Sequence, residues 1–185
     1  MQKETSTESM SRERMERYRA LAMAFSYPDE ALFKSMPDLD RAQLRSEYDR
    51  LFRAREIWLY EAEYLAKHQF QRSTLLADIS GFYRAFGVQA DRERPDALPA
   101  ELEFMHFLIF KRLHALDSGI ADAEGKADIC RDAEKKFFSA HLLPAARLIA
   151  ERILSEVGEG FYSESAGELL RFMESEERHF GGEAA

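Results

Sequence analysis

The densest group of charged side chains in the sequence lies between two segments that have the apolar spacing of helices. Five charges fall within six positions, at Asp91, Arg92, Glu93, Arg94 and Asp96. Carboxylates beside apolar and aromatic walls suit a hydrophobic peptide that carries a positive end. The same composition is typical of a solvated hinge between helices, so both interpretations stand on composition alone.

A candidate metal site is the pair Glu103 and His106, which has the i, i+3 spacing used by di-iron carboxylate sites in helical bundles. Such a site needs a second Glu-x-x-His motif and two further glutamates, and the sequence has no second copy of the motif. The segment 47–52 also places two carboxylates beside an aromatic stripe, which alone is typical of a core-facing helix with an acidic edge. We therefore expect no metal and no cofactor, and keep a helical metal-binding enzyme as an alternative.

Groups that could carry covalent catalysis are few. The single cysteine, Cys130, has no flanking His or Lys to activate its thiol and fits a buried structural role. The sequence has no phosphate-binding glycine loop and no G-x-S-x-G nucleophile elbow. The sequence thus predicts a protein that is not an enzyme, with no catalytic residues.

The elements that would position these side chains are all helical by pattern. The 185 residues are 45% hydrophobic, which is enough for one sizeable core, and no alternating run of Val, Ile and Thr predicts a strand. Gly87 is placed to end one helix, and Pro95 and Pro99 disfavour helix in the segment that follows. We expect an all-α bundle with helices near 10–27, 29–36, 40–52, 57–68, 73–87, 100–116, 121–140, 144–157 and 161–180.

The expected domain organisation follows from the same pattern. It is a disordered lead-in at 1–9, an N-terminal helical lobe at 10–87, a hinge at 88–99, a C-terminal helical lobe at 100–180 and a tail at 181–185. A proline-bearing hinge makes both a monomer and a dimer that swaps lobes plausible.

The charge of the chain limits its partners. A formal net charge of −8 argues against nucleic acid and against an anionic membrane, because both select basic surfaces. No apolar run approaches the roughly 20 residues of a membrane span, and the N-terminus has no signal-peptide apolar region. With one cysteine, the chain fits a reducing compartment, so we expect a cytoplasmic protein that binds a basic partner.

Several motifs together resemble the TorD/DmsD/NarJ family of cytoplasmic chaperones for molybdenum-cofactor oxidoreductases, over about residues 18–173. The motifs are Glu47-Tyr48-Asp49-Arg50-Leu51-Phe52, the stretch from Asp78 to Gly87, Glu93-Arg94-Pro95-Asp96, Glu101-Leu102-Glu103-Phe104-Met105, and Phe137 with His141-Leu142 and Pro144.

This resemblance implies a TorD-like arrangement of about nine helices in two lobes joined by a hinge. It also implies a chaperone that binds the apo catalytic subunit of a molybdoenzyme, in much of the family including its twin-arginine signal peptide. The client contacts that the resemblance implies are Tyr60, Glu61, Gly81, Phe82, Tyr83, Glu93, Asp96, His141 and Pro144. The independent chemical argument agrees, because a twin-arginine peptide joins a cationic segment to an apolar one.

The chain departs from the family pattern in two places. Trp58-Leu59-Tyr60-Glu61-Ala62 stands where the family often has two prolines before Tyr-Glu-Ser, and Ala140 and Ala145 replace a frequent aspartate and tryptophan. The sequence therefore leaves open which molybdoenzyme is the client and whether the contact is to the leader or to the mature chain. A permanent accessory subunit of a reductase complex is a further alternative.

Overall fold

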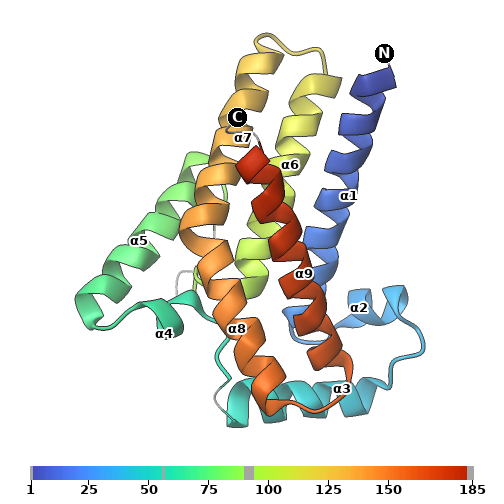
Figure 1. The fold of residues 1–185 in the computed structure, drawn as a ribbon, viewed down its shortest axis with the longest axis vertical. Helices are drawn as coiled ribbons and strands as arrows, with labels where there is room; N and C mark the ends of the chain where they lie inside the picture. The colour runs from blue at the N-terminus through green and yellow to red at the C-terminus, as the bar shows by residue number, and fades with distance from the viewer. Residues whose placement is uncertain (1, 56, 90–93, 183–185) are drawn as a thin grey trace.

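The computed structural model describes residues 2–55, 57–89 and 94–182 of the chain (Figure 1). These ranges contain helices and no strand, which confirms the predicted all-α class. None of the helices combines the length and apolar character needed to cross a bilayer. The elements are α1 (Gln2–Phe25), α2 (Glu30–Ser35), α3 (Arg41–Tyr48), the π-helix η1 (Asp49–Ala54), α4 (Glu61–Leu65), α5 (Gln69–Ala85), α6 (Leu98–Asp117), α7 (Ala123–Phe137), the π-helix η2 (Phe138–Leu142), α8 (Leu143–Glu156) and α9 (Phe161–Gly182).

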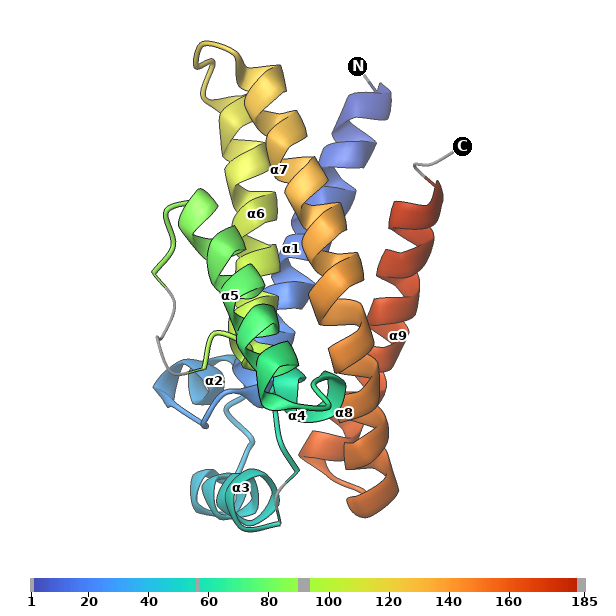
Figure 2. The same cartoon turned by 90° about the vertical axis from the view of Figure 1, so that its left-hand side faces the viewer.

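The long helices form the bundle and the short ones cover its end and one side. In Figure 1, α1, α6, α7, α8 and α9 run along the long axis, with α1 against α6, α6 against α7, and α8 against α9. The short α3 lies across the lower end, and α4 and α5 lie on one side (Figure 2). Side chains from both sides of the connector 88–99 join one apolar core, so the expected lobes share it.

Local chemistry explains several helix ends, including the one predicted at Gly87. The carboxylate of Asp40 accepts a hydrogen bond from the amide of Gln43 at 2.9 Å and so caps α3. Asp29 caps α2 in the same way. Gly87 has a φ of 75°, a left-handed conformation that favours glycine, and it ends the helical geometry directly after α5.

The segment 57–60 is extended, where the sequence predicted helix from 57 to 68. The amide of Leu98 donates to the carbonyl of Leu59 at 2.8 Å, and Tyr60 forms an isolated antiparallel bridge with Ala97. These backbone bonds to a distant segment replace helical ones, so the helix is reduced to α4. The following helix, α5, begins at Gln69 because His68 caps it, four residues before the predicted start.

Two other boundaries differ from the predictions. Helix α1 begins at Gln2, so it includes most of the segment that the sequence analysis expected as a disordered lead-in. Helix α6 begins at Leu98 and holds Pro99 in its first turn, where the missing amide proton costs no hydrogen bond.

The predicted break between the seventh and eighth helices is absent. The amide of Leu143 bonds to the carbonyl of Phe138, five residues earlier, so the helix widens into the π-helix η2 directly before Pro144. The wider turn lets the chain pass a proline without ending the helix. When α3–η1 and α7–η2–α8 are each counted once, the described ranges hold eight unbroken helices, one fewer than the expected nine or so.

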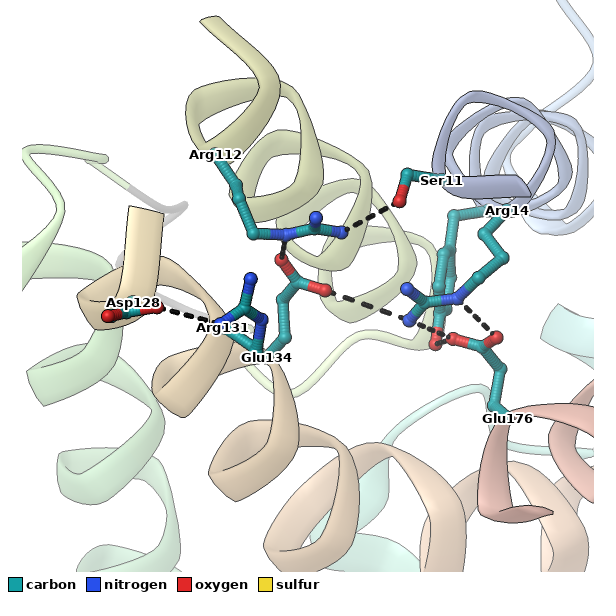
Figure 3. A network of polar contacts seen from close by, with 8 residues as sticks. Ser11, Arg14, Arg112, Asp128, Arg131, Glu134 and Glu176 are labelled. Atoms are coloured by element: carbon teal, nitrogen blue, oxygen red, sulfur yellow. Dashed lines mark hydrogen bonds and ion pairs between the residues drawn. The ribbon is translucent and has the colours of Figure 1, made fainter. Parts of the chain in front are cut away.

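A buried ionic network joins the long helices (Figure 3). Arg14 of α1 donates to Glu176 of α9 at 2.6 and 2.7 Å, and Arg112 of α6 donates to Glu134 of α7 at 2.7 Å. A contact of 3.6 Å between Arg14 and Glu134 links the two pairs. We call these four residues the arginine network, and each of its carboxylates faces at least one guanidinium.

Candidate functional site

A groove of about 700 Å³ lies between the α4–α5 side and η2. Its walls combine apolar side chains with carboxylates and one imidazole. We call it the α4–α5 groove, and its lining residues are Glu61, Leu65, Phe70, Gln71, Thr74, Leu75, Ala77, Asp78, Ala140 and His141. In Figure 2 the helices α4 and α5 face the viewer.

His141 connects two carboxylates in this groove. Its Nδ1 atom lies 3.2 Å from Oε1 of Glu61, and its Nε2 atom lies 3.0 Å from Oδ2 of Asp78. Burial alone would lower the pKa of His141, but the hydrogen bonds and charges of Glu61 and Asp78 outweigh it and raise that pKa. The imidazolium form is therefore populated to a higher pH than in a free histidine, and it can donate to both carboxylates.

The two carboxylates differ in exposure. The side chain of Asp78 is 63% exposed at the groove, whereas those of His141 and Glu61 are almost completely buried. The three side chains thus form a polar chain that runs from solvent into the core.

Two further carboxyl groups lie beneath the groove. Glu101, in the first turn of α6, is fully buried, and burial raises its pKa well above the usual range. The neighbouring carboxyl of Glu61 and the charge of Asp96 add to this rise. Glu101 is therefore favoured in its protonated form. We call Glu61, Asp96, Glu101 and His141 the acidic cluster.

Asp96 fastens the connector to α4. Its Oδ2 atom accepts a hydrogen bond from the amide of Ala62 at 3.1 Å, and its carbonyl accepts one from the amide of Glu61 at 2.9 Å. Asp96 therefore caps the short helix α4 from a segment more than thirty residues away. The hydroxyl of Tyr83 donates to the carbonyl of Pro95 at 2.9 Å and holds the same segment against α5.

Aromatic rings support the imidazole. The ring of Phe82 lies edge-on to those of His141 and Phe137, at centroid distances of 5.8 and 5.3 Å. Tyr83 packs against Phe104 at 4.7 Å and is buried. Gly81 directly precedes Phe82 on α5. A Cβ added at Gly81 would meet no atom of another element within 4 Å, so there is free space at this position.

The structure brings some of the predicted contact residues together and separates others. Glu61 and His141 line the groove, while Phe82, Tyr83 and Asp96 support it from behind. Tyr60 lies under the guanidinium of Arg94 at 3.9 Å and is not among the lining residues, and neither is the half-buried Pro144. Glu93 lies outside the described residues, and the role of all nine residues in client contact stays a prediction.

Sequence reasoning missed the most exposed parts of the groove. Phe70 is 78% exposed, which is unusual for a large aromatic side chain, and Asp78 is the outer partner of His141. Phe70, Thr74 and Asp78 are spaced four residues apart and so share one face of α5. That spacing is visible in the sequence, but only the packing of α5 against η2 turns the face into a groove wall.

The residues of the alternative metal hypothesis are placed apart from this groove. His106 lies with its Nδ1 atom 3.0 Å from the carbonyl of Met15 in α1, and Glu103 is exposed. Among the described residues, no group of three or more His, Cys, Asp or Glu side chains is arranged to hold a metal ion.

Comparison with known proteins gives one family and three curated relatives. The family model of the nitrate reductase delta subunit matches residues 9–150. The chain is 33% identical over 170 residues to the chlorate reductase assembly chaperone protein of Ideonella dechloratans, covering 83% of each chain. It is 30% identical over 181 residues to the selenate reductase assembly chaperone protein of Thauera selenatis, covering 90% of this chain and 89% of the relative.

A third relative aligns over a shorter range. The perchlorate reductase assembly chaperone protein of Dechloromonas aromatica is 32% identical over 107 residues, which is 56% of this chain and 45% of the relative. The family model spans well over half of the chain, and it includes every motif that carried the resemblance to the TorD/DmsD/NarJ group. This chain therefore belongs to the nitrate reductase delta subunit family, and the resemblance to that group of maturation chaperones is confirmed.

Proposed function

We propose that this protein is a system-specific chaperone, without catalysis of its own, for the apo catalytic subunit of a molybdopterin-cofactor oxidoreductase. It acts in the cytoplasm and holds the subunit for cofactor insertion before export or assembly. The α4–α5 groove binds the twin-arginine leader of that subunit. The relatives support the chaperone role, because three of them are named as assembly chaperones of chlorate, perchlorate and selenate reductases.

The observation that carries the leader-binding proposal is the pairing of charge and apolar surface in one groove. Asp78 offers an exposed carboxylate, and Phe70, Leu65 and Leu75 offer apolar surface beside it. A leader with adjacent arginines and an apolar segment can place a guanidinium on Asp78 while its apolar side chains cover Phe70. Such a contact combines electrostatic attraction with burial of exposed apolar area.

The test is binding of a synthetic twin-arginine leader peptide, measured by fluorescence anisotropy at low and at physiological ionic strength. We expect saturable binding that weakens with salt, because exposed charges are screened over roughly 8 Å at physiological ionic strength. Asp78→Asn and Phe70→Ala should each weaken binding by about 5- to 30-fold, the range expected for roughly 1–2 kcal/mol at a contact.

Two control variants change exposed side chains that lie outside the α4–α5 groove. Glu103→Gln changes an exposed carboxylate on α6, and Leu148→Ala removes an exposed apolar side chain on α8, and neither lines the groove. Both should bind the leader like the unchanged protein. Equal affinity of Asp78→Asn, Phe70→Ala and the controls would remove this groove from the function.

A second candidate function is a permanent accessory subunit of the reductase complex, which the description of the family as a delta subunit favours. Affinity purification from native cells separates the two. A chaperone should recover the catalytic subunit with its leader uncleaved, whereas an accessory subunit should recover the mature, cofactor-loaded complex.

A further inference from the structure

A second groove, of about 340 Å³, lies where α5 ends against the α6–α7 hairpin. We call it the lysine groove, and it is separate from the α4–α5 groove. Its lining residues are Ala85, Phe86, Lys111, His114, Ala115, Ile120, Lys126, Ile129 and Cys130.

The lysine groove is open because α5 is shorter than the helices it covers. Figure 2 shows the α6–α7 hairpin extending beyond the C-terminal end of α5. Helix α5 ends shortly before Gly87, so α5 does not cover the upper part of the hairpin on this side. Ile129 on α7 is 62% exposed and Ile120 in the hairpin loop is 40% exposed. A further segment placed here would bury apolar area that now faces solvent.

The charges lining this groove are those of Lys111 and Lys126, and the imidazole of His114 also lines it, in a chain of net charge −8. In the described part of the chain, the hydrogen bonds of the two lysines go to backbone carbonyls, those of Phe86 and Ala121. Neither lysine forms an ion pair within 4 Å there, so both ammonium groups can still pair with an anionic partner.

Two nearby carboxylates are paired with arginines. Asp117 bonds to Arg12 at 3.0 Å, and Asp128 bonds to Arg131 at 2.7 Å. No carboxylate is among the residues that line the lysine groove, so its ammonium groups give the lining a positive charge.

We propose that the lysine groove docks a partner segment whose apolar side chains are flanked by carboxylates. The apolar side chains cover Ile120 and Ile129, and the carboxylates pair with Lys111 and Lys126. This segment is opposite in charge to the one proposed for the α4–α5 groove. The two grooves are lined by different residues, so both segments can be bound at once.

The test uses two fluorescent amphipathic peptides with the same leucines, one carrying glutamates and the other carrying lysines at the flanking positions. The glutamate peptide should bind saturably and the lysine peptide should not. The double variant Lys111→Glu/Lys126→Glu should weaken binding of the glutamate peptide by roughly tenfold or more, because two attractive pairs become repulsive. The single variant Lys136→Glu changes an exposed lysine of α7 outside the groove and should stay within about twofold.

Apolar contact is tested separately with Ile129→Ser, which should weaken binding, and Leu148→Ser, an exposed leucine on α8, which should not. An excess of the twin-arginine leader peptide should leave binding of the glutamate peptide unchanged. The proposal would be overturned if the glutamate peptide did not bind saturably, if both peptides bound equally, or if the leader peptide competed with the glutamate peptide. It would also be overturned by a dimer in analytical ultracentrifugation that Ile129→Ser converts to monomer, because a second copy of the chain would then occupy the groove.

Discussion

Two groups of buried ionisable side chains lie in the same bundle, and they are built on opposite principles. In the arginine network, two guanidinium groups face two carboxylates, and Tyr18 adds a hydrogen bond to Glu176 at 2.7 Å. The acidic cluster has three carboxyl groups and one imidazole, which contacts Glu61, and no ion pair of Glu101 is found among the described residues. In the arginine network, guanidinium groups balance the carboxylate charges. In the acidic cluster, protonation of a carboxyl group reduces the negative charge instead.

The difference in charge balance matches a difference in position. The arginine network joins α1, α6, α7 and α9, and none of its four residues lines either groove (Figure 3). The acidic cluster lies directly beneath the α4–α5 groove, and two of its members line it. Burial alone therefore does not mark a functional site in this protein. An excess of buried acid lies beneath the groove that we propose as the client site, and burying unpaired carboxyls lowers stability unless another interaction favours them.

The largest expected effect is removal of a carboxylate from the arginine network. Glu176→Ala leaves the guanidinium of Arg14 and the hydroxyl of Tyr18 without their partner, so the free energy of unfolding should fall by about 3–5 kcal/mol. Chemical denaturation followed by circular dichroism measures this. The control is Glu177→Ala on the same helix, which breaks an exposed pair with Arg147 and should cost below about 1 kcal/mol. Equal losses in the two variants would mean that the network contributes no more than a surface pair.

A smaller effect of opposite sign is expected in the acidic cluster. The folded pKa of Glu101 is raised, so the folded state holds its proton more tightly than the unfolded state. Stability from this group is therefore lost as the pH rises above the unfolded value of 4.5, by at most about 1.4 kcal/mol per pH unit. Glu101→Gln lacks this titration, so it should become more stable relative to the unchanged protein between pH 5 and pH 8.

Denaturant curves for both proteins at pH 5 and pH 8 measure the Glu101 effect. Glu103→Gln, an exposed change two positions along the same helix, is the control and should show no such divergence. If the difference between Glu101→Gln and the unchanged protein is the same at both pH values, Glu101 is ionised in the folded state and the comparison between the two groups fails.

A third prediction concerns the only basic member of the acidic cluster. Asp78 raises the pKa of His141, after Glu61, so Asp78→Asn should lower it. A histidine with a raised pKa contributes stability below its unfolded value of 6.5 and loses it as the pH rises through the folded pKa. Asp78→Asn should therefore cost stability at pH 6 and little at pH 9. Titration of the imidazole by nuclear magnetic resonance measures the shift, and an unchanged pKa would show that Asp78 does not act on His141 in solution.

The smallest expected effect concerns Gly81, where a glycine inside α5 lowers the stability of the helix that borders the α4–α5 groove. Gly81 lies inside α5 with free space around it, so Gly81→Ala should stabilise the protein by about 0.5–1 kcal/mol through higher helix propensity. If Gly81 is a client contact, the same change should weaken leader binding. Gly167→Ala on α9 is the control in a helix away from the groove, although its added Cβ comes within 3.4 Å of Arg171. A loss of stability in Gly81→Ala would contradict the open surface found there.

The sequence by itself determined the helical class, the family, and those helix ends that local chemistry fixes. Asp29, Asp40 and Gly87 act within one turn of their own position, so capping and left-handed geometry are visible in the residue types. Periodicity likewise placed most of the apolar side chains in the core. Glu61 and His141 were identified through family motifs, and they do lie in one groove.

The tertiary structure alone decided which charged side chains are buried. Asp96 was expected at the rim of a client groove and lies in the core, because the amide of Ala62 and the backbone of the 57–60 segment draw it inward. Glu101 stands in the first turn of α6 and is fully buried close to Glu61, forty positions earlier. Local spacing carries no information on a neighbour so far away in the chain. Whether a carboxylate meets solvent, an arginine or another carboxyl therefore depends on how the helices pack.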